Sequence, residues 1–270
     1  MEPRVPEPPG SPRLLRPRTV GELLTDAFEL YRRHWQNLVV IVAVIVIPLS
    51  FLQVLVGDLW IRQGLTEEEL RSGVESGTFA GAILGSIVVA ITSILMWTVL
   101  TGAVTRAAAG TFLGRDLEIG ESYRYGFARF WSIVLIGVLA ALAIAAGFIL
   151  LVVPGFIVMT FLSCAIPVLV IEGRRGREAL RRSWGLVRGF GWPVFGTIIV
   201  AGLLTGIVNS LLTAPFGDNG AARFIAASLA SVITMPYSAL VGVFIYLNLR
   251  VRKEQYSAAD LERDLASTAT

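Results

Sequence analysis

The chain has 270 residues, of which 54% are hydrophobic and 16% charged, and its mean hydropathy is +0.70. A soluble domain carries about 25% charged residues, so this composition excludes a soluble enzyme, a nucleic-acid-binding domain and a disordered chain. One cysteine, Cys164, and one histidine, His34, exclude an intramolecular disulfide and a histidine-based metal cluster. The composition predicts a membrane protein without a metal or cofactor.

The N-terminal part changes character near residue 18. Six of the twelve prolines lie in residues 1–17, which predicts a disordered tail. Thr19 and Glu22 then have the spacing of a capping box, which marks a helix start. Apolar residues recur at helical spacing from there to Tyr31, so we expect an amphipathic helix lying in the membrane interface.

Five windows without a charged residue follow, at 34–57, 76–105, 130–171, 189–217 and 224–249. About 20 apolar residues cross a bilayer, so the window 130–171 holds two spans and the others one each. Proline interrupts a helix and glycine tolerates a turn, so we expect a hairpin at Pro154-Gly155, with a re-entrant break as the alternative. The sequence predicts an all-α membrane protein: six transmembrane helices with cytoplasmic amphipathic interfacial helices over 18–250, then a cytoplasmic tail at 251–270.

The basic residues are distributed asymmetrically. Twenty of the 23 lysines and arginines lie in alternate segments, namely 1–33, 106–129, 172–188 and 250–270. The positive-inside rule therefore predicts that both termini are cytoplasmic. Trp35, Trp131 and Trp192 would stand at the cytoplasmic starts of the first, third and fifth spans, where amphipathic rings favour the headgroup region. Lys253 is the only lysine against 22 arginines, a bias typical of guanine-cytosine-rich bacterial coding, so the membrane in question is expected to be a bacterial cell membrane.

The expected spans carry little chemistry. Their cores contain no Asp, Glu, Lys, Arg or His, which argues against a proton-coupled pump or a voltage sensor. Gln53 and Asn209 are the candidates for a polar pathway, although hydrogen bonds between helices are the favoured explanation. Gly202 and Gly206 allow close helix packing, within the chain first and between copies second. No nucleophilic triad can be assembled, so we expect no catalytic residues and no enzyme.

The segment after the fourth expected span is the most basic in the chain. Its six arginines face only Glu172 and Glu178, which leaves a net charge of +4. Leu180, Trp184 and Val187 form an apolar stripe beside them. Planar guanidinium groups suit bidentate contacts with phosphate, and the alternative is that the charges only fix the topology. The candidate residues for binding lipid headgroups are Arg174, Arg175, Arg177, Arg181, Arg182 and Arg188.

Short motifs in this region resemble a known family. They comprise Pro167, Glu172, Ala179-Leu180, Arg182-Ser183, Leu186 and Arg188-Gly189, with 18–24 and Pro154-Gly155 elsewhere. The pattern is similar to that of the bacterial six-span family named for the membrane domain of glycerophosphodiester phosphodiesterases. In that family the phosphodiesterase chemistry resides in a separate soluble domain. The resemblance therefore implies a membrane module without catalysis.

Two functions from different classes follow as hypotheses. The first is a non-enzymatic integral membrane module that organises anionic phospholipid or a protein partner, including a second copy, at the inner leaflet, with no nucleic acid. The alternative is a permease or channel for a small neutral or amphipathic solute, using spans kinked at Pro48, Pro167 and Pro236. A polar cavity near Gln53 or Asn209 would favour the permease, and a dry core with an open basic groove would favour the module.

Overall fold

The computed structural model describes residues 16–63, 76–113, 130–217 and 220–268. It describes their side chains except at residues 45, 49, 52–63, 76–91, 95, 96, 220 and 221. These residues form helices and contain no strand, which confirms the all-α class. The elements are α1 (Val20–Arg33), α2 (Trp35–Gln63), α4 (Ser76–Phe112), α6 (Phe130–Leu150), α7 (Val152–Leu162), α8 (Ala165–Glu172), α9 (Gly176–Val187), α10 (Gly191–Thr213), the 3₁₀ turn η1 (Ala214–Phe216), α11 (Gly220–Glu254) and α12 (Ala258–Thr268).

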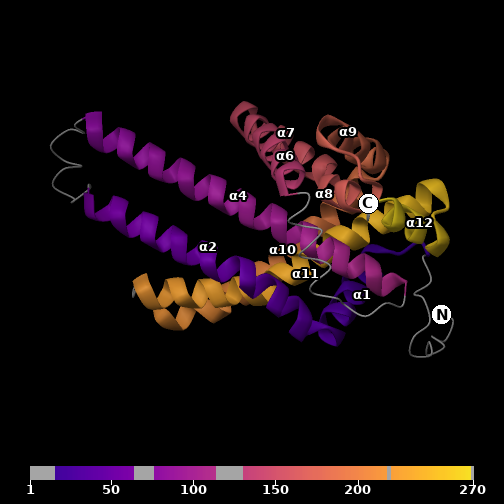
Figure 1. Cartoon of the computed structure of the whole chain (residues 1–270), viewed down its shortest axis with the longest axis horizontal. Coiled ribbons are helices and arrows are strands. Elements are labelled where there is room, and N and C mark those ends of the chain that lie inside the picture. Colours follow the sequence, from indigo (N-terminus) through magenta and orange to yellow (C-terminus); the bar gives the residue numbers. More distant parts are fainter. Residues whose placement is uncertain (1–15, 64–75, 114–129, 218–219, 269–270) are drawn as a thin grey trace.

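The long helices pair as hairpins. In Figure 1, α2 runs beside α4, and α10 runs beside α11, which also packs against α2 and α4. The third hairpin joins α6 to α7, and α8 continues α7 toward α4. Every charge-free window of the sequence therefore contains helix. The buried side chains lie mainly where α4, α8 and α11 meet, so the core is apolar and central.

Four helical stretches in the described part are long and apolar enough to cross a membrane: Phe130–Leu150, Val152–Glu172, Gly191–Phe216 and Ala222–Glu254. The number is five if α1 and the first half of α2, which meet at 84°, count as one bent span. Only 22% of the first apolar window and 17% of the third are buried, so their apolar side chains face outward. A soluble monomer rarely exposes so much apolar surface. These helices indicate a multi-pass membrane protein. Four of the six expected spans are thus long and apolar enough to cross a membrane.

Three tryptophans lie on the surface at the starts of helices. Trp35 is 51% exposed at the first residue of α2, Trp131 80% at the second residue of α6, and Trp192 85% at the second residue of α10. Each exposed ring therefore lies where an outward-facing apolar helix begins. This is the arrangement of an aromatic belt at a membrane interface.

Helix α1 begins as its sequence predicts. The Thr19 side chain accepts from the Glu22 amide, and the Glu22 carboxylate accepts from the Thr19 amide at 2.9 Å. Leu23, Ala27 and Leu30 are buried along one side, and α1 packs against α11. The capping box and the amphipathic character of this segment are confirmed.

The hairpin between α6 and α7 turns earlier than we expected. The break lies at Leu151, and Pro154 is the third residue of α7. A proline is tolerated in the first turn of a helix because its missing N–H would have no intrahelical partner there. Gly147 and Gly155 allow the two helices to approach closely, since a Cβ on Gly147 would lie 3.0 Å from the Gly155 Cα.

Candidate functional site

The span formed by α7 and α8 is broken, and α9 closes the break. Helix α7 ends at Leu162, and α8 restarts with Pro167 in its first turn, where the ring prevents a continuous helix. The Ser183 hydroxyl of α9 donates to the Phe161 carbonyl at 2.7 Å and accepts from the Cys164 amide at 3.2 Å. Ser183 is fully buried, so two backbone groups inside the protein depend on it. Ser183 therefore fixes α9 to the spanning helix.

Glu172, at the end of α8, gathers charged side chains from three other segments. Its side chain is only 7% exposed. It accepts hydrogen bonds from Arg174 Nε at 2.9 Å, Arg182 Nε at 3.0 Å, Arg250 Nη1 at 2.9 Å and the Tyr246 hydroxyl at 3.1 Å. A buried carboxylate is stable only when it is paired and hydrogen-bonded, and Glu172 meets both conditions. This cluster joins α8, α9 and α11.

The same network extends to α12. Arg182 Nη2 lies 2.6 Å from Glu254, and Arg250 Nη2 lies 3.4 Å from Asp264 of α12. Arg250 Nε is within ion-pair distance of Glu254 but is not aligned for a hydrogen bond. The Tyr256 hydroxyl donates to Asp264 at 2.7 Å, and burial together with this bond raises the pKa of Tyr256. The positive and negative charges of the network are therefore matched internally.

Buried Leu261 and Leu265 also attach α12 to the bundle, and Arg106 of α4 donates to the Leu265 carbonyl at 3.4 Å and to Thr268 at 3.2 Å. The segment expected to be a C-terminal tail thus includes a docked helix. We call α9, α12 and the last turn of α11 the arginine-rich end, and Figure 1 shows these helices gathered on one side of the molecule.

The six candidate arginines fall into two groups. Arg174 and Arg182 each donate from Nε to the buried carboxylate of Glu172, so their positive charges are already paired within the protein. The other four side chains are exposed and form no ion pair or side-chain hydrogen bond with any described residue. These four are Arg175, Arg177, Arg181 and Arg188.

Most of this second group lies along one face of α9. Arg177, Arg181, Trp184 and Arg188 follow each other at intervals of four, three and four residues, which puts them within about 60° around a helix. Trp184 is 41% exposed, and its ring lies 4.3 Å from that of Phe161 on α7. We call these four residues the outer face of α9. It presents three cations around an aromatic ring.

The apolar stripe that we expected beside the arginines is divided between two environments. Val187 is buried in the core, Leu180 is half-buried against it, and Trp184 belongs to the outer face. Ala179 and Leu186 complete the buried side of α9. The stripe therefore serves internal packing, with only its tryptophan turned outward.

The structure also shows what surrounds the other residues that the sequence analysis singled out. Asn209 donates to the Thr205 carbonyl at 2.9 Å and to Thr234 of α11 at 3.0 Å, which is the expected kind of bond between helices. Gly202 and Gly206 have no described atom within 4 Å of a Cβ position, so no described helix makes the expected close approach at this pair. Gln53 lies outside the described side chains. Cys164 is buried at the break, as expected.

Among the described residues, no group of histidine, cysteine and carboxylate side chains could hold a metal ion. The fold is all-helical, and its long apolar helices indicate a multi-pass membrane protein with an arginine-rich end. No family model, no curated protein and no solved structure matches the chain. The family resemblance therefore rests on the motifs alone and stays a prediction. Three motif residues, Glu172, Arg182 and Ser183, form the contacts that hold α9.

Proposed function

We propose that the chain is a non-enzymatic membrane module that gathers anionic phospholipid at the inner leaflet of a bacterial cell membrane. In this proposal six helices span the bilayer, and both termini and α9 are cytoplasmic. The asymmetry of the basic residues supports that orientation. The family resemblance supports a module without a catalytic domain.

The observation that carries the proposal is the outer face of α9. Its arginines have no carboxylate partner among the described residues, whereas Arg182 and Arg250 nearby are both paired with the buried Glu172. Guanidinium groups bind phosphate in a bidentate manner, and an exposed tryptophan prefers the depth of the headgroups. Each basic residue near an anionic surface contributes about 1 kcal/mol, so the three cations of this face contribute about 3 kcal/mol before screening.

The test compares two charge-matched double variants. Arg177→Gln with Arg181→Gln removes two cations from the outer face of α9. The control, Arg33→Gln with Arg263→Gln, removes two exposed arginines that are paired within their own helices. Each protein is reconstituted in phosphatidylcholine vesicles containing phosphatidylglycerol and extracted with detergent at low and high salt. The phosphatidylglycerol retained per protein is then counted.

Loss of two contributions of about 1 kcal/mol predicts retention weakened by up to about thirtyfold at low salt, with a smaller salt dependence. The control should retain lipid like the unaltered chain. Equal retention by both double variants, with unchanged orientation, would refute lipid binding by this face. Loss of a protein partner with lipid retention unchanged would also contradict the proposal, in favour of a protein-binding surface.

A further inference from the structure

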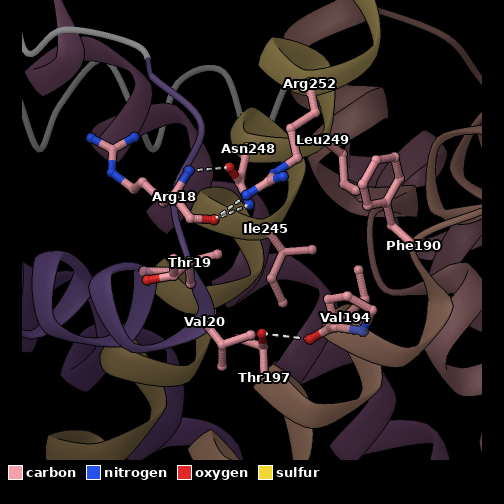
Figure 2. A pocket seen from close by; sticks show the side chains of 12 residues that line it. Arg18, Thr19, Val20, Phe190, Val194, Thr197, Ile245, Asn248, Leu249 and Arg252 are labelled. Carbon is pink, nitrogen blue, oxygen red and sulfur yellow. Dashed lines mark hydrogen bonds between the residues drawn. The ribbon is translucent and has the colours of Figure 1, made fainter.

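A pocket of about 240 Å³ lies between the start of α1, the first turns of α10 and the last turns of α11. Its walls are mostly apolar and include Val20, Val194 and Ile245 (Figure 2). Asn248 and Arg252 stand together at the opposite end of the view, next to the chain at Arg18. The pocket is therefore amphipathic: its charged and amide groups lie on one side, and the Thr197 hydroxyl at the other end is bonded to the Pro193 carbonyl at 2.8 Å (Figure 2).

Hydrogen bonds hold this polar side in place. The Arg18 amide donates to Asn248 Oδ1 at 2.8 Å, and the Arg18 carbonyl accepts from Asn248 Nδ2 at 3.2 Å and from Arg252 Nη2 at 2.8 Å. The Arg18 side chain is engaged elsewhere, by Asp26 at 2.7 Å. The guanidinium of Arg252 is thus anchored by one nitrogen, and its other donors have no partner among the described residues.

The charge at this side of the pocket is not neutralised by the described acids. Among the described residues, Arg252 bonds only to the Arg18 carbonyl, and its neighbour Lys253 donates to two backbone carbonyls, those of Gly185 at 2.8 Å and Arg188 at 2.5 Å. Both cations lie against the Phe190 ring, at 5.9 Å and 5.7 Å from its centroid. Phe190 also lines the pocket. An anion entering here would meet the guanidinium of Arg252 without displacing a carboxylate, and Lys253, which does not line the pocket, adds a second positive charge beside Phe190.

The pocket lies at the depth where the apolar helices begin and end. Helix α10 starts at Gly191 with the exposed Trp192, and the span of α11 ends at Glu254. An apolar lining next to a cationic group, placed where the apolar helices end, matches the boundary between the headgroup of a lipid and its acyl chains. The volume is below the roughly 300–1,000 Å³ of pockets that enclose a whole small ligand. A lipid needs no full enclosure, because the bilayer holds the rest of its chains.

We infer that this pocket binds one anionic phospholipid, with the phosphate at Arg252 and the first part of an acyl chain against Val194 and Ile245. The pocket shares no residue with the outer face of α9, so each proposal can fail alone. A pocket of this kind predicts a single, saturable lipid, whereas the outer face of α9 predicts several exchangeable ones.

Native mass spectrometry of the full chain in detergent micelles tests the inference, with phosphatidylglycerol as the probe. Arg252→Gln removes the cation, and Val20→Phe fills the pocket from a half-buried position without a change in charge. Arg263→Gln is the charge-matched control on α12. Losing one charge-assisted phosphate contact predicts about tenfold weaker retention of one phosphatidylglycerol in Arg252→Gln. The same loss is expected in Val20→Phe, and none in Arg263→Gln or in Arg177→Gln with Arg181→Gln.

Thermal unfolding of each variant shows whether the bundle is intact. A folded Arg252→Gln and a folded Val20→Phe that both keep the tightly held lipid would overturn the inference. Competition separates a lipid from a free anion: lysophosphatidylglycerol should displace the retained lipid, and inorganic phosphate should not. Displacement by inorganic phosphate at equal concentration would overturn the lipid assignment in favour of a simple anion site.

Discussion

Ser183→Ala isolates the connection between α9 and the broken span. The change removes one hydroxyl that serves two backbone groups, the Phe161 carbonyl and the Cys164 amide. Each buried group left without a partner costs about 1–3 kcal/mol, and the higher helix propensity of alanine returns about 0.5 kcal/mol. We expect the free energy of unfolding to fall by about 1.5–5.5 kcal/mol.

The chain carries its own reporter of this break. Cys164 is the only cysteine, and it is fully buried beside Ser183. Its reaction with a maleimide in detergent micelles therefore requires local opening. If the break opens about 2 kcal/mol more easily, Ser183→Ala should raise the labelling rate about thirtyfold.

Ser231→Ala is the matched control, because among the described residues the Ser231 hydroxyl bonds only to the Ala227 carbonyl of its own helix. It should leave the labelling rate of Cys164 unchanged. Equal labelling rates in the two variants would show that the Ser183 hydroxyl does not hold the break closed.

Three further outcomes are expected. The capping box lowers the pKa of Glu22 to about 2, so its stabilisation is complete above the unfolded pKa of about 4.3 and is lost as the pH falls toward 2; Glu22→Gln should remove this part of the acid dependence of thermal unfolding. Gly147→Leu should separate α6 from α7 and cost several degrees in melting temperature, whereas Gly206→Leu, with no described neighbour, should cost little. Reporter fusions after Asp218 should lie outside the cell and fusions after Arg175 inside; a cytoplasmic signal at Asp218 would contradict six spans.

The features that could be predicted from the sequence are local ones. The capping box at Thr19 and Glu22 depends on two residues three positions apart, and it forms as expected. The long apolar windows became helices because a bilayer-length apolar segment has few other ways to satisfy its backbone. The hairpin near Pro154 was predicted at the wrong residue, since proline is equally compatible with the turn and with the first turn of the next helix.

The contacts that define the arginine-rich end could not be predicted, because they join residues distant in the chain. Glu172 and Arg250 are 78 positions apart, and nothing in the sequence pairs them. The role of Ser183 depends on a helix break 19 residues earlier. One signal was available: Ser183 lies between Ala179 and Leu186 on the apolar side of α9, where a polar residue needs a buried partner.

Arg181 and Arg182 show why net charge alone does not describe this end of the molecule. They are adjacent, so their side chains point about 100° apart on α9. Arg182 turns inward to Glu172 and Glu254, and Arg181 turns outward. If these arginines served only to fix the membrane orientation, it would make no difference which of the two residues carried the charge. We therefore expect Arg181→Gln and Arg182→Gln to keep the same orientation but to differ otherwise.

Arg182→Gln leaves two carboxylates short of a partner and should lower the free energy of unfolding by about 2 kcal/mol, with lipid retention preserved while the bundle is folded. Arg181→Gln should leave stability within about 0.5 kcal/mol and weaken phosphatidylglycerol retention about fivefold, because it removes one exposed cation. Thermal unfolding and lipid counting on the same two proteins measure both effects. If the two variants lost lipid and stability in parallel, the division of the arginines into an inward and an outward group would have no functional meaning.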